Sequence, residues 1–84
     1  MRFCVITFRS VMPAQRADAF LRRKGYECRI QRTPRWMEEQ GCGYSLRLRS
    51  RDIGAAAQLL RANEVAFQKV DLLRENGKME ELRL

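Results

Sequence analysis

Apolar and polar residues alternate along short stretches of the chain, and this pattern predicts four β-strands. Residues 26–31 and 44–49 each place apolar side chains on one side and mostly charged or polar ones on the other, which is typical of half-buried strands. Residues 2–8 are apolar on both sides, which indicates a strand at the centre of a sheet. Residues 65–73 are predicted as the fourth strand.

Two helices are predicted between these strands, because apolar residues recur there three and four positions apart. The first helix is expected to be capped by Ser10 and to stop at Gly25. The second is expected to begin at Ser50 or Asp52 and to stop near Asn63.

The resulting order, β-α-β-β-α-β, predicts an α+β fold of the ferredoxin-like, split β-α-β type, with an antiparallel sheet and two helices on one face. Right-handed crossovers place the first strand between the third and the fourth. The loop between the second and third strands then lies at the carboxyl end of the first strand, where the first helix begins.

With 84 residues the chain forms one domain, which we assign to residues 1–74. The remaining residues 75–84 contain an Asn76-Gly77 pair, which favours either a hairpin turn or a break before a short helix. We expect this tail to be a loosely held extension.

The charge balance favours an anionic partner, because 17 basic and 10 acidic residues give a net charge of +7. Nucleic acid, an acidic protein or a small anion fits this charge. The basic residues are scattered, however, so the alternative is that they only keep a small domain soluble.

The chain contains no histidine, which excludes cysteine–histidine dyads, histidine-dependent triads and imidazole metal sites. We therefore expect a carrier or binding module without a cofactor or metal rather than an enzyme. No apolar run reaches the roughly 20 residues of a membrane span, and the first residues do not form a signal sequence. The expected location is the cytoplasm, without membrane contact.

The three cysteines, Cys4, Cys28 and Cys42, are an odd number without CxxC spacing, which argues against a disulfide framework and a thiolate metal site. Cys4 and Cys28 fall within strand patterns and are expected to be small buried hydrophobic residues. Cys42 lies between Gly41 and Gly43, so its sulfur has little side-chain cover. It is the candidate functional residue.

The predicted topology brings Cys42 close to the first turn of the first helix. Helix amides and neighbouring arginines such as Arg9 and Arg35 would lower the pKa of its thiol by about one unit, whereas Glu38 and Glu39 would raise it. The alternative is that Cys42 is an unreactive surface cysteine in a glycine-rich hairpin.

Arginines at 29, 47 and 49 are predicted on the sheet face that the helices leave open. RNA-recognition domains of this topology bind single strands on that face, but they need stacked aromatic rings, and only Phe3 or Phe8 could supply one. A solvated face is therefore favoured over nucleic acid binding. Apolar residues on both sides of the first strand suggest that the tail, or a second copy in a homodimer, covers this face.

Several short motifs together resemble a known family. They are Thr7-Phe8-x-Ser10 after the opening strand, an alanine-rich first helix, the Pro34-Arg35 pair, and Cys42-Gly43 leading into an alternating strand. Their order over roughly residues 2–73 is similar to that of the selenium/sulfur (Se/S) carrier protein-like family of small bacterial domains.

The resemblance implies sulfur or selenium trafficking, with Cys42 holding a persulfide or selenosulfide between a donor and an acceptor protein. It also implies that Pro34 and Arg35 frame the loop and that Thr7, Phe8 and Ser10 flank it. One departure concerns the loop itself, where Glu38, Glu39 and Gln40 replace the serines of similar sequences. The alternative function is a basic binding module in which the cysteine is incidental.

Overall fold

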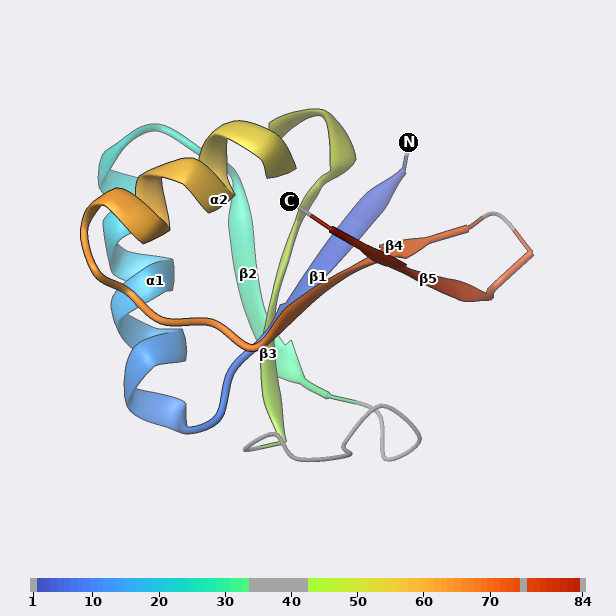
Figure 1. Cartoon of the computed structure of the whole chain (residues 1–84), viewed down its shortest axis with the longest axis horizontal. Helices are drawn as coiled ribbons and strands as arrows, with labels where there is room; N and C mark the ends of the chain where they lie inside the picture. The colour runs from blue at the N-terminus through green and yellow to red at the C-terminus, as the bar shows by residue number, and fades with distance from the viewer. Residues whose placement is uncertain (1, 34–42, 75, 84) are drawn as a thin grey trace.

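The computed structural model of the chain describes residues 2–33, 43–74 and 76–83 (Figure 1). Its elements, in chain order, are β1 (Phe3–Thr7), α1 (Val11–Arg23), β2 (Cys28–Arg32), β3 (Tyr44–Arg49), the 3-10 turn η2 (Ser50–Asp52), α2 (Ile53–Ala62), β4 (Lys69–Leu73) and β5 (Met79–Leu82). No helix within these ranges is long and apolar enough to cross a bilayer.

The strands form one antiparallel sheet in the order β2-β3-β1-β4-β5. The predicted α+β class is therefore confirmed, and β1 lies between β3 and β4 as the right-handed crossovers require. Each helical connection, β1-α1-β2 and β3-α2-β4, passes over one intervening strand, which is the split β-α-β arrangement. The fifth strand is added at the outer edge of β4.

Both helices pack on one face of the sheet (Figure 1), and the core lies between the two layers. Its strand residues follow the period of two that the sequence shows, with Cys4 and Ile6 of β1 opposite Leu48 and Leu46 of β3. The helices contribute three alanines and three larger aliphatic side chains, namely Ala14, Ala17, Ala56, Leu21, Ile53 and Leu60.

The centre of the other sheet face is also buried. Val5, Thr7, Ser45 and Asp71 alternate with the core residues, so they point away from the helices, yet each is at most 5% exposed. This burial occurs within a single chain. The burial of Val5 and Thr7 agrees with the expectation that both faces of the first strand are covered, whereas Ser45 lies on the polar side of its strand pattern and is nevertheless buried.

Each helix ends in a Schellman motif, which turns the chain through a left-handed residue. In α1 this residue is Gly25, as predicted, with φ 92°. In α2 it is Glu64, with φ 59°, and the Val65 N–H donates to the Leu60 carbonyl at 2.9 Å. Because Val65 completes the helix end and packs in the core, β4 begins at Lys69 rather than at residue 65.

Residues 76–83 of the tail form a hairpin with β4 rather than a loosely held extension. Leu73 pairs with Met79 and Val70 with Leu82 across the β4–β5 ladder. The turn uses Gly77 at φ 83°, and the Lys78 N–H donates to the Asn76 side chain at 3.0 Å. The Asn76-Gly77 pair therefore forms a hairpin turn, even though the residues that follow it are mostly polar.

Candidate functional site

The predicted site residues fall into two groups. Pro34, Arg35, Gly41 and Cys42 lie outside the residues that the structure describes. Thr7, Phe8, Ser10 and Gly43 are described, and Gly43 is the residue at which the β2–β3 loop returns to the sheet.

The described ends of this loop are joined by a short hydrogen bond. The Thr33 N–H donates to the Gly43 carbonyl at 2.7 Å, and Gly43 adopts φ 83°, a conformation that favours glycine. Thr7 pairs with Ser45, two residues after Gly43. Both loop ends therefore lie at the carboxyl end of β1, the end of the molecule where α1 also begins (Figure 1), as the predicted topology requires.

Thr7 and Phe8 are part of the scaffold under this edge. The Thr7 hydroxyl is buried and donates to the Lys69 carbonyl at 3.4 Å, which links β1 to the start of β4. Phe8 has no exposed surface and belongs to the core cluster. Both side chains are therefore buried in the scaffold at this edge and do not line a surface.

Ser10 lies at the surface and is the N-cap residue of α1. Its side chain makes no capping hydrogen bond, and the first turn of α1 contains no acidic residue. The positive end of this helix is therefore not offset by a carboxylate in its own first turn.

Cys4 is completely buried in the core, as predicted. Its burial raises the pKa of the thiol, and the negative charge of Asp71 raises it further. Because the thiolate is the nucleophilic form of cysteine, Cys4 is an inert core residue at neutral pH.

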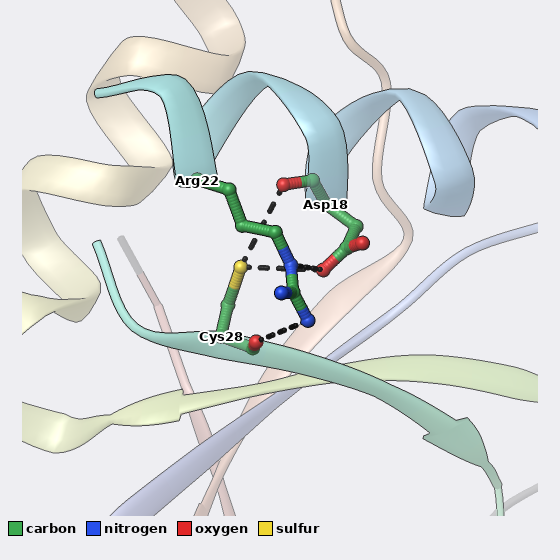
Figure 2. Close-up of polar contacts among 3 residues, drawn as sticks. All are labelled: Asp18, Arg22 and Cys28. Atoms are coloured by element: carbon green, nitrogen blue, oxygen red, sulfur yellow. Dashed lines mark hydrogen bonds and ion pairs between the residues drawn. The ribbon is translucent and has the colours of Figure 1, made fainter. Parts of the chain in front are cut away.

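Cys28 is half-buried and held in a polar cluster that the sequence interpretation did not identify (Figure 2). Its sulfur points from β2 toward α1 and lies 3.4 Å from Asp18 Oδ1. Arg22 donates through Nε to the same carboxylate oxygen at 2.9 Å and through Nη2 to the Cys28 carbonyl at 3.0 Å. Asp18 and Arg22 are four residues apart in a predicted helix, so their ion pair could have been predicted from the sequence.

Burial, followed by the hydrogen bond and the negative charge of Asp18, raises the pKa of Cys28 to about 11, although Arg22 acts in the opposite direction. Cys28 is therefore a protonated hydrogen-bond donor at neutral pH. Its role is to tie β2 to α1, which differs from the simple hydrophobic role expected from its strand position.

No group of three or more cysteine or carboxylate side chains within residues 2–33, 43–74 and 76–83 is arranged to hold a metal ion. Cys4 and Cys28 both carry free thiols.

Comparison with known proteins gives one match. A protein-family model described as "Putative Se/S carrier protein-like" matches residues 3–70. No curated protein matches the chain, and no solved structure matches it. The matched range runs from the first residue of β1 into β4, so it includes both helices and both ends of the β2–β3 loop.

Proposed function

Since the chain belongs to the Se/S carrier protein-like family, we propose that it carries sulfane sulfur or selenium between partner proteins on the thiol of Cys42. The chemistry needs a cysteine that ionises near neutral pH and can be reached by another protein.

The observation that carries the proposal is the state of the other two thiols. Cys4 has no exposed surface, and burial raises its pKa. Cys28 has its pKa raised to about 11, so roughly one molecule in ten thousand carries its thiolate at pH 7. Cys42 is the remaining candidate for the carrier thiol.

The loop anchors support this choice. The Thr33–Gly43 hydrogen bond holds the loop ends at the same edge as the start of α1. A thiolate near a helix N-terminus gains about 0.3–1 kcal/mol at an exposed position, and α1 has no acidic residue in its first turn to offset this effect. The net charge of +7 also favours the anionic form of a thiol.

Loading is a simple exchange reaction. The Cys42 thiol first loses its proton to water, and the thiolate attacks the terminal sulfur of a persulfide on the donor protein. A new sulfur–sulfur bond forms at Cys42, the sulfur–sulfur bond of the donor breaks, and the donor leaves as a thiolate. An acceptor thiolate unloads the carrier in the same way. A selenium atom follows the same course, and neither step needs an oxidant.

Intact-mass measurement after incubation with glutathione persulfide tests this proposal. We expect the wild-type chain to gain the mass of one sulfur atom, and Cys42→Ser to gain none. Cys28→Ser is the matched control and should load like the wild type, because Cys28 is protonated at neutral pH. An unmodified wild-type chain, or equal loading of Cys42→Ser, would contradict the proposal.

A further inference from the structure

A groove with a volume of about 700 Å³ lies where β1 and β2 begin and β3 ends. Its lining includes four arginines and two aromatic rings, namely Arg22, Arg29, Arg47, Arg49, Phe3 and Tyr26. Nothing in the proposed carrier reaction uses this groove. Phe3 and Thr7 are four residues apart on β1, so the groove and the loop anchors are about 13 Å apart along that strand.

Two of the four arginines are neutralised by carboxylates. Arg22 pairs with Asp18, and Arg49 pairs with Glu27. Among the residues that the structure describes, the other two, Arg29 and Arg47, have no carboxylate partner. Within the described residues, two positive charges of the groove therefore have no carboxylate partner.

These two charges lie directly opposite each other. Arg29 on β2 and Arg47 on β3 are cross-strand partners, and both are on the sheet face away from the helices. Like charges in such a pair destabilise a sheet, since their side chains emerge about 5 Å apart. A bound anion would remove that repulsion.

Arg47 is held in a fixed position by Phe3. Its guanidinium carbon lies 3.8 Å from the centre of the Phe3 ring, which is a close cation–π contact. Its Nε atom is covered and has no hydrogen-bond partner in the described part of the chain. A buried N–H without an acceptor is costly, and the contact of the guanidinium with the ring offsets only part of that cost.

From these observations we propose that the groove binds a small organic phosphate, with Arg29 and Arg47 together holding its phosphate group. Guanidinium groups match phosphate oxygens in shape, and two positive charges match a phosphate monoester, which carries about −1.5 to −2 at pH 7. The volume lies within the roughly 300–1,000 Å³ of small-molecule sites and exceeds what a free anion fills. The organic part would lie against the other residues that line the groove.

Titration with AMP, followed by NMR chemical shifts at low salt, tests the proposal. We expect shifts at the groove residues and an affinity that falls about tenfold or more in Arg29→Gln and in Arg47→Gln. Arg51→Gln is the control, because Arg51 is exposed on η2 and does not line the groove. Arg47→Lys keeps the charge without the planar fork, and it should show a smaller loss in a chain that retains its fold.

Three results would overturn the proposal. The first is an AMP affinity that is absent, or is unchanged by both glutamine variants. The second is inorganic phosphate binding as tightly as AMP, which would leave no role for the organic part. The third is far tighter binding of a single-stranded RNA, which would reassign the groove to nucleic acid. Cys42→Ser should bind AMP like the wild type, so this test is independent of the carrier proposal.

Discussion

Replacing Phe8 with alanine is expected to lower the free energy of unfolding by about 3–5 kcal/mol. Phe8 has no exposed surface and is among the largest fully buried side chains of the chain. A domain of this length has a total stability of only about 4–13 kcal/mol, at roughly 0.05–0.15 kcal/mol per residue. The loss is therefore a large share of the stability, because alanine leaves a cavity between β1 and α1.

Urea denaturation measures this loss, and two further variants provide the comparison. Phe20→Ala removes a ring that is only partly buried against the core, so we expect a clearly smaller effect. Phe8→Leu keeps most of the apolar volume and should cost about 1–2 kcal/mol, which gives a measurable value if the alanine variant does not fold. A cost below about 1 kcal/mol for Phe8→Ala would show that the ring is not in the core, and Phe8 would again be a candidate for loop contact.

Replacing Asp18 with asparagine is expected to lower the pKa of Cys28 by about one unit. The variant removes the negative charge, which is one of the causes of the raised pKa, and leaves Arg22 free to stabilise the thiolate. The pKa should remain above its ordinary value because burial, the largest cause, is unchanged. At pH 8 the thiolate population of Cys28 then rises about tenfold.

Alkylation by iodoacetamide, followed by peptide mapping, measures this change. We expect Cys28 in Asp18→Asn to react about 3–10-fold faster than in the wild type, because the nucleophilicity of the thiolate falls as its pKa falls. Arg22→Gln is the opposite control, since Arg22 lowers the pKa of Cys28, and it should slow the reaction.

Cys4 serves as an internal reporter in the same experiment. It is wholly buried, so it reacts only when the chain unfolds. If Cys28 reacts faster with iodoacetamide while Cys4 remains unmodified, the chain is still folded. The faster rate then reports the change of charge beside Cys28. An unchanged or slower rate for Cys28 in Asp18→Asn would show that the carboxylate does not control this thiol.

The sheet was largely predictable from sequence because its side-chain period is two. Tyr44–Arg49 alternates strictly, and the structure places a strand over the same residues. The doubly apolar Phe3–Thr7 stretch correctly indicated the central strand, since both of its faces are buried. Helix α1 was delimited by Ser10, which occupies the N-cap position without making a capping hydrogen bond, and by Gly25, whose positive φ suits a helix end.

Two predictions were wrong because the same residue type occurs in more than one structural setting: the start of the fourth strand and the role of Cys28. Val65 has the β-branched character of a strand residue, but its position after the left-handed Glu64 makes it part of a helix end. Cys28 fits the inward alternation of a strand, but its partners Asp18 and Arg22 come from α1, and a strand pattern contains no information about them. A local helix end decides the first case, and tertiary contacts decide the second.

The sequence predicted where the candidate site lies in the fold, but not which side chains are in contact there. Chain order alone brings the β2–β3 loop to the start of α1, and the described anchors Thr33 and Gly43 lie there. The roles of Thr7 and Phe8 could not be read from the motif, because buried and surface-lining residues look alike in a short loop sequence. The reactivity of Cys42 stays a prediction.

The central claim is that Cys42 alone among the three cysteines is a thiolate near neutral pH. The most direct test is the rate of iodoacetamide alkylation of each cysteine in the wild-type chain as a function of pH. We expect Cys42 to titrate below the free-thiol pKa of about 8.5, Cys28 to titrate near 11, and Cys4 to remain protected. A Cys42 that titrates at or above the free-thiol value, or reacts no faster than Cys28 at pH 7, would contradict the account.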